Sequence, residues 1–149
     1  ICAAAARHHH RRPLGLVVAA LSTSGRWALE FGPHAASGVL FGLPRSHNYG
    51  QKPGRDIALL RSELLRLIGF IEGLDVNLTA SADWSALKAT VKRATRKSDL
   101  RRAEDPVDAV LCAYLARFAT VRPEDVTVYG DSDEGCIVTP TCPPPPPSR

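Results

Sequence analysis

The sequence predicts an α/β domain, and three observations support this fold class. Long amphipathic segments in the middle of the chain predict three helices. The short run Arg26–Phe31 alternates between an apolar face and a second face, which predicts a strand. Near the end, two short segments rich in β-branched residues flank a Gly-Asp-Ser-Asp-Glu-Gly turn and predict a hairpin. The 149 residues are 44% hydrophobic, enough for one globular domain with its own core.

Each element follows from local pattern. Apolar residues recur at three- and four-residue spacing over Arg55–Ile71, and Gly73 can end this helix. In the last long helix, Asp105 is expected to be the N-cap and Pro106 to take the first helical position. The remaining predicted elements are a short helix at His34–Phe41, a helix at Asp83–Arg96, a helix at Asp105–Thr120, and strands at Val126–Tyr129 and Cys136–Thr139.

The two ends of the chain differ in composition from its centre. Residues 1–13 predict an unstructured leader, residues 14–140 a single domain, and residues 141–149 a proline-rich tail that joins neither helix nor sheet. No apolar run approaches the length that spans a bilayer, and the leader has the reverse of the charge order of a secretory signal. The four cysteines are scattered, which predicts reduced thiols. We therefore expect a cytoplasmic protein with no membrane partner, and the oligomeric state stays open.

Positive charge is concentrated in one segment. Seven basic residues and one acid give residues 88–102 a charge of +6, and because the whole chain carries +4, the remainder carries −2. Such a patch is suited to a polyanion such as nucleic acid, although a basic run is also typical of an ordinary solvated helix face. The candidate nucleic-acid-binding residues are Lys88, Lys92, Arg93, Arg96, Lys97, Arg101 and Arg102.

Three acids are candidate catalytic residues and metal ligands: Glu30, Asp105 and Asp108. Asp105 and Asp108 are three residues apart at the expected helix start and therefore share one face. Carboxylates are the oxygen ligands that Mg²⁺ or Mn²⁺ takes, and such ions activate water for phosphodiester cleavage. The alternatives stay open, because the Asp-Pro-Val-Asp run is also a good helix start and Glu30 suits a water-facing edge strand.

The order of motifs resembles a known family of unknown function, whose members are described as predicted nucleases of ribonuclease-H-like fold. The resemblance rests on LEFGPHAA, LFGLPRS, YGQKPGRD, EDPVDAVLCAYLA and VTVYGDSDEGCIVTP, and it covers residues 26–140. Its most specific motifs, Asp-Pro-Val-Asp-Ala-Val and Glu-Gly-x-Ile-Val-x-Pro, are also similar to the last helix of Holliday-junction-resolvase-type nucleases, in which paired aspartates at a helix start hold metal. The resemblance implies a mixed sheet with three long helices and a C-terminal hairpin.

The resemblance also implies roles for the three acids. Glu30 corresponds to the acid that ends the fourth strand of that fold, and Asp105 and Asp108 to the acids of its C-terminal helix. Family members usually carry Glu-Val-Tyr-Pro where this chain has Glu-Phe-Gly-Pro, so Gly32 replaces a tyrosine. Such domains begin with a strand that carries an aspartate, whereas no acid precedes Arg26 here. The resemblance therefore predicts a truncated domain that lacks its opening strand and its first metal ligand.

Three functions follow as hypotheses from these observations. The first is a nuclease that depends on Mg²⁺ or Mn²⁺ and is impaired by the missing ligand. The second is a non-catalytic module that binds nucleic acid or a protein through the basic segment. The third is a gene fragment without function. The substrate, DNA or RNA, is not specified by any of these observations.

Overall fold

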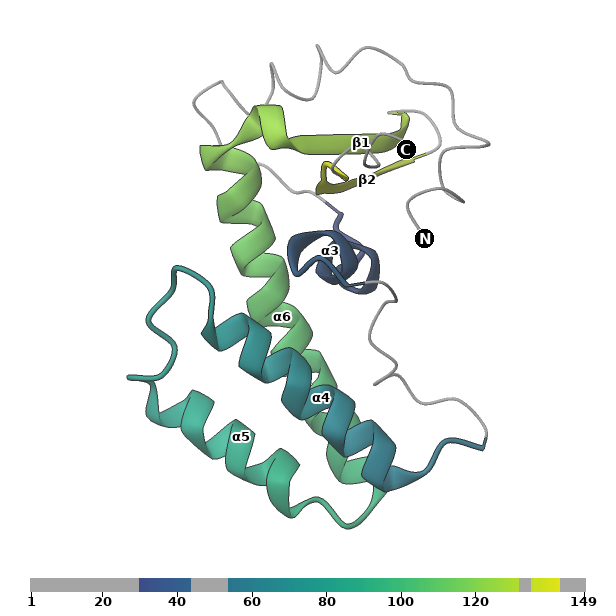
Figure 1. Cartoon of the computed structure of the whole chain (residues 1–149), viewed down its shortest axis with the longest axis vertical. Helices are drawn as coiled ribbons and strands as arrows, with labels where there is room; N and C mark the ends of the chain where they lie inside the picture. The colour runs from purple at the N-terminus through teal and green to yellow at the C-terminus, as the bar shows by residue number, and fades with distance from the viewer. Residues whose placement is uncertain (1–29, 44–53, 132–134, 143–149) are drawn as a thin grey trace, which may run out of the picture. The chain divides into compact units, whose positions relative to one another are not determined.

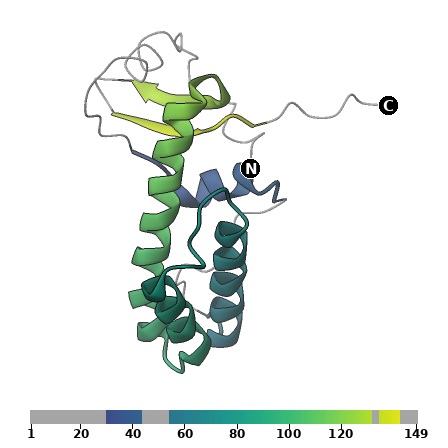
Figure 2. The ribbon, with the colours of Figure 1, turned by 90° about the vertical axis from the view of Figure 1, so that its left-hand side faces the viewer.

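The computed structural model describes residues 30–43, 54–131 and 135–142. The chain forms two compact units: a helical unit of residues 47–111, and a mixed unit of residues 1–46 and 112–149. The boundary between them falls inside α6 (Lys97–Val121), which Figure 2 shows as one unbroken helix.

The helical unit contains α4 (Ile57–Glu72), α5 (Ala82–Arg93) and the first part of α6, with α4 and α5 forming a helical hairpin (Figure 1). Asp56 caps α4 by accepting a hydrogen bond from the amide of Ala58 at 3.2 Å, and Gly73 ends the helix as predicted. The apolar spacing predicted from the sequence becomes the buried face of α4. The fully or nearly fully buried side chains of this unit are Leu60, Leu64, Leu67, Ile68, Ile71, Trp84, Val91, Ala94, Leu100, Ala103, Val107 and Leu111.

α5 begins where Ser81 accepts a hydrogen bond from the amide of Trp84 at 3.3 Å. It ends at Arg93, so the predicted extension to Arg96 is wrong. The backbone turns out of the helix at Ala94 (φ −58°, ψ 123°), whose side chain is buried. The guanidinium of Arg61 donates to the carbonyl of Ala94 at 3.1 Å, which fixes this exit against α4.

α6 begins at Lys97, eight residues before the predicted start at Asp105, and Pro106 lies inside it. The prediction gave most weight to the Asp-Pro pair, but Leu100, Ala103, Val107 and Leu111 recur at three- and four-residue spacing through it and are all buried. Pro106 removes one helical hydrogen bond, and it lies at an exposed position of the helix. Burial of the apolar stripe thus outweighs the local helix-start signal.

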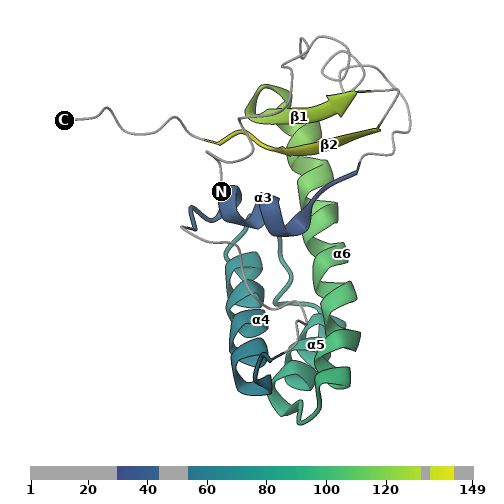
Figure 3. The ribbon, with the colours of Figure 1, turned by 90° about the vertical axis from the view of Figure 1, so that its right-hand side faces the viewer.

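The mixed unit contains α3 (Pro33–Leu40), the short 3₁₀ helix η1 (Pro123–Asp125), and the strands β1 (Val126–Asp131) and β2 (Gly135–Pro140). The strands pair antiparallel with Val128 opposite Val138, which confirms the predicted hairpin (Figure 3). Phe31 forms a parallel bridge to Val138, and the Val138 amide donates to the carbonyl of Glu30 at 2.9 Å. The described pairing is therefore mixed, with β2 between an antiparallel and a parallel neighbour.

A small apolar cluster holds the mixed unit together. Ala119, Val126 and Val138 are buried, and Phe31, Phe118 and Val128 pack against them. α3 packs against β2, and the short helix predicted at His34–Phe41 is confirmed with a one-residue shift. Gly42 follows it at φ +61°, a conformation that favours glycine.

The structure confirms an α/β chain with four helices and a two-stranded antiparallel sheet in its described part. The leader, most of the predicted strand Arg26–Phe31 and most of the proline-rich tail lie outside the described residues. None of the described helices combines the length and the apolar character that crossing a membrane requires. Cys112 and Cys136 are not in disulfide bonds, whereas Cys142 is disulfide-bonded, so the expectation of reduced thiols fails at that residue.

Candidate functional site

The candidate site lies on one face of α6 within the helical unit. Its residues are Arg101 and, three, four and seven residues after it, Glu104, Asp105 and Asp108. Residues at these spacings share one face of a helix. From Arg101 to Asp108 the helix rises about 10 Å. Arg101 and Asp105 are exposed, while Glu104 and Asp108 are half-buried. A basic side chain and three carboxylates thus line one stripe at the border of the buried face.

The carboxylate of Glu104 is the most perturbed group of this stripe. Burial raises its pKa, and the carboxylates of Asp108 and Asp105 raise it further, while Arg101 partly offsets these effects. Its Oε1 atom is buried without a hydrogen-bond partner. A charged, unsatisfied oxygen beside two other carboxylates is costly, so this position favours either a proton or a cation.

The structure changes the roles open to the predicted acids. Asp105 and Asp108 lie in the third and fourth turns of α6, so the alternative in which they start the helix is wrong. Glu30 is exposed and belongs to the mixed unit, where its backbone pairs with β2. Of the three predicted acids, only Asp105 and Asp108 are therefore brought together within one unit.

The carboxylates of α6 are compatible with one class of cation site. Among the residues that the structure describes, no three His, Cys, Asp or Glu side chains group as a complete metal site would need. Mg²⁺, however, is usually held by one or two carboxylates together with waters and substrate phosphates. Glu104 and Asp108, one helical turn apart, provide two carboxylates, one of them with an oxygen that lacks a hydrogen-bond partner. These residues fit a cation that is shared with a phosphate.

The basic segment divides into two parts in the structure. Lys88 is not available as a phosphate contact, because its ammonium lies 2.6 Å from the carboxylate of Glu72 and both side chains are partly buried. The indole of Trp84 donates to the same carboxylate at 3.1 Å. The hydrogen bond from Lys88 lowers the pKa of Glu72 despite the opposing effect of burial, and the bond from Trp84 lowers it further. Lys88 thus connects α5 to α4.

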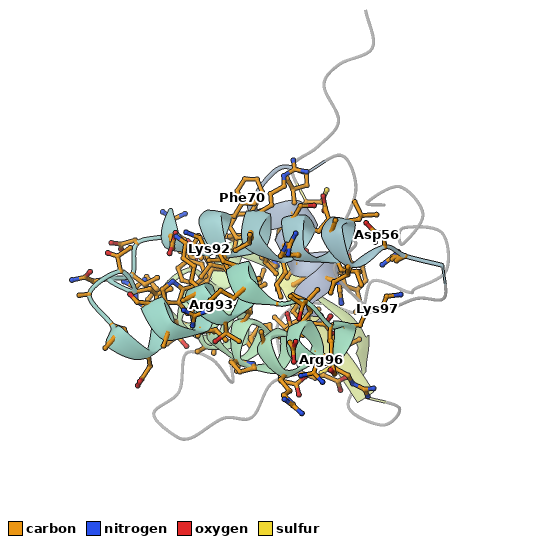
Figure 4. The ribbon with its side chains drawn as sticks, turned by 90° about the horizontal axis from the view of Figure 1, so that it is seen from below. Asp56, Phe70, Lys92, Arg93, Arg96 and Lys97 are labelled. Atoms are coloured by element: carbon orange, nitrogen blue, oxygen red, sulfur yellow. The ribbon has the colours of Figure 1, made fainter. Side chains whose placement is uncertain are left out.

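The other six basic residues are exposed and form what we call the α5–α6 surface: Lys92, Arg93, Arg96, Lys97, Arg101 and Arg102. They occupy the end of α5, the connection and the first two turns of α6, and Figure 4 shows the first four of them. Asp99 is the acid within this stretch, and it contacts Arg96 at 3.9 Å. In the described part of the chain, Lys92, Arg93, Arg101 and Arg102 form no ion pair.

The mixed unit has a separate open cavity of about 500 Å³ beside η1. Its charged lining residues are Arg122 and Asp125, which pair with each other at 3.8 Å, and the guanidinium of Arg122 also lies over the ring of Phe118. The charges of this cavity are therefore already balanced, and it lacks the unsatisfied groups of the α6 stripe.

A family model described as a protein of unknown function, DUF429, matches residues 4–134. This span is most of the chain. The chain belongs to the DUF429 family. No curated protein and no solved structure matches it. This match confirms the resemblance to a family of unknown function that the sequence motifs predicted.

The sequence of this DUF429 chain did not lead to the prediction of one residue of the α6 stripe, Glu104. Glu104 directly precedes the Asp-Pro-Val-Asp motif, and a helix assumed to begin at Asp105 leaves it outside. The signal that identifies it is its spacing of four residues to Asp108 and three to Arg101, visible once the apolar stripe is extended back to Leu100.

Proposed function

We propose that this DUF429 protein binds nucleic acid and hydrolyses its phosphodiester bonds with Mg²⁺ or Mn²⁺. The observation that carries the proposal is the single face of α6 on which Arg101 precedes Glu104, Asp105 and Asp108. Metal-dependent phosphodiester cleavage uses carboxylates to hold a cation and a basic group to hold the phosphate, and this stripe provides both. The resemblance of the Asp-Pro-Val-Asp-Ala-Val motif to metal-binding helices of nucleases supports the same function.

Glu104 and Asp108 would hold the cation, and Arg101 would hold the phosphate through its forked guanidinium. When bound, a divalent cation polarises the phosphoryl oxygen and lowers the pKa of water. Because burial raises the pKa of Glu104, a proton competes with the cation for this carboxylate. Cation binding should therefore strengthen as the pH rises above the raised pKa of Glu104.

The ribonuclease-H-like fold belongs to the same proposal. Its support is the mixed pairing of β2, which has β1 antiparallel on one side and a parallel bridge to Phe31 on the other. Glu30 stays a predicted catalytic acid and metal ligand because of the resemblance of its motif. Since the described carboxylates do not group in threes, we expect hydrolysis to be slow.

The test is cleavage of end-labelled duplex, single-stranded and branched nucleic acid with the chain in excess over substrate. We expect slow cleavage that requires Mg²⁺ or Mn²⁺, disappears in Asp108→Asn, and persists in Asp83→Asn. Asp83 is a matched control because it is an exposed aspartate on α5 in the same unit. Absence of cleavage of every substrate with both cations would reject the proposal.

The second candidate function is binding of nucleic acid without hydrolysis. The observation that favours it is the α5–α6 surface, whose six exposed basic residues are independent of the carboxylate stripe except at Arg101. Binding that is abolished by reversing these charges, together with no cleavage under any condition, would select this candidate over the first.

A further inference from the structure

The α5–α6 surface carries a large net positive charge. Residues 92–102 contain six basic side chains and one acid, a net charge of +5. Lys92 and Arg93 end α5, Arg96 lies in the connection, and Lys97 opens α6. The N-terminal end of a helix adds a partial positive charge of its own. A polyanion is the partner that such a surface attracts most strongly.

Specific contacts hold the connection at the centre of this surface in place. Arg61 of α4 donates to the carbonyl of Ala94 at 3.1 Å. Asp99 accepts a hydrogen bond from the backbone amide of Arg96 at 3.2 Å and thereby caps the start of α6. Ala94 and Leu100, on either side of the connection, are buried. The basic residues therefore project from a fixed backbone, which lowers the entropy lost when they bind.

The composition of this surface distinguishes between two kinds of nucleic acid. Residues 88–102 include no aromatic residue, and Trp84, on the preceding turn of α5, is buried and bonded to Glu72. Proteins that bind single strands rely on aromatic side chains on which the bases stack. The exposed residues between the basic ones include Thr95 and Ser98, whose hydroxyls donate to phosphate oxygens. The surface thus offers contacts to phosphates and none to unstacked bases.

We infer that the α5–α6 surface is a binding site for the phosphate backbone of double-stranded nucleic acid, independent of base sequence. This inference rests on the proposed function, which names nucleic acid as the ligand, and it specifies that the nucleic acid is a duplex. Six basic side chains that each neutralise one phosphate give a log–log salt slope of about −5 on a duplex, since each contact contributes about −0.9. Divalent cations and the α6 carboxylates are not needed for this contact.

The test is fluorescence anisotropy with a labelled duplex and a labelled single strand of equal phosphate number, in EDTA. We expect the duplex to bind more tightly, with the predicted salt slope and equal affinity for unrelated sequences. Arg93→Glu/Arg102→Glu should weaken duplex binding at least about 50-fold at about 0.1 M salt, because each lost contact forfeits roughly 0.9 ion. The control Arg66→Glu/Arg122→Glu changes the net charge equally through exposed arginines outside the surface and should leave binding near wild type.

Three results would overturn the inference. They are tighter binding of the single strand, unchanged duplex affinity in Arg93→Glu/Arg102→Glu with a wild-type thermal melt, and duplex-independent capture by anionic lipid vesicles. Because EDTA removes the cation, a failure of binding is read separately from a failure of hydrolysis. Cleavage without duplex binding at this surface would reject the inference while leaving the proposed function intact.

Discussion

Substitution of Glu104 by glutamine should stabilise the chain while weakening its binding of a divalent cation. The wild-type carboxylate is half-buried, has an oxygen without a hydrogen-bond partner, and lies next to Asp105 and one turn from Asp108. Glutamine keeps the size of the side chain and removes its charge. The stability should therefore rise and the cation affinity fall. This is the trade-off between stability and activity that is common at functional sites.

The magnitude follows from two costs that the substitution relieves. A like-charge pair at four-residue spacing on a helix costs about 0.2–0.5 kcal/mol. An unsatisfied buried polar atom costs about 1–3 kcal/mol, of which an amide recovers only a part. We expect Glu104→Gln to raise the free energy of unfolding at pH 7 by about 1 kcal/mol, equivalent to about 3 °C in Tm for a chain of this size.

The pH dependence has a defined sign. The pKa of Glu104 in the folded chain is raised above its ordinary value of 4.5. The wild type therefore loses stability as the pH rises from the ordinary pKa through the raised one. The advantage of Glu104→Gln should therefore be small at pH 4 and larger at pH 7.

The assay is thermal unfolding at both pH values, with and without Mn²⁺, for wild type, Glu104→Gln and the exposed control Glu124→Gln. Mn²⁺ with duplex present should raise the Tm of the wild type and of the control, but not of Glu104→Gln. A lower Tm for Glu104→Gln at pH 7 without metal would refute the reasoning, since it would mean that the charged carboxylate is satisfied in the folded chain.

Two further predictions concern the helices that carry the site. Pro106→Ala should raise the free energy of unfolding by about 2 kcal/mol in urea titrations, because it restores a helical hydrogen bond inside α6; a neutral or destabilising effect would support a helix that starts at Asp105 instead. Glu72→Gln should destabilise the chain by about 1 kcal/mol at pH 7, because it removes the charge that Lys88 and Trp84 hydrogen-bond. The pKa of Glu72 is lowered, so this contribution is present above pH 4.5 and is lost as the pH falls through the lowered value; a loss that stays constant down to acid pH would contradict it.

The sequence was sufficient to predict the elements whose pattern is periodic. The buried stripe of α4, its end at Gly73, and the hairpin of β1 and β2 all follow from spacing and turn residues. α6 was misplaced at its start because a strong local signal, Asp-Pro, competed with an apolar stripe that continues to Leu100. The free energy of burying that stripe decided the outcome, and it depends on tertiary contacts that a local motif does not encode.

The candidate site was predicted only in part, for a related reason. Asp105 and Asp108 were identified by spacing, but the burial of Glu104 depends on what packs beside the helix. Lys88 was grouped with the basic segment, whereas its partner Glu72 is sixteen residues away on α4. Long-range ion pairs of this kind leave no periodic trace in the sequence.

The measurement that tests the central claim most directly is a titration with Mn²⁺ in which electron paramagnetic resonance reports the concentration of the free ion. Wild type and Asp108→Asn are each titrated in the presence and in the absence of a short duplex. If Glu104 and Asp108 hold a cation jointly with a phosphate, the wild type binds Mn²⁺ much more tightly with the duplex than without it, and Asp108→Asn loses this gain. Equal Mn²⁺ binding by the two proteins in the presence of the duplex would contradict the claim.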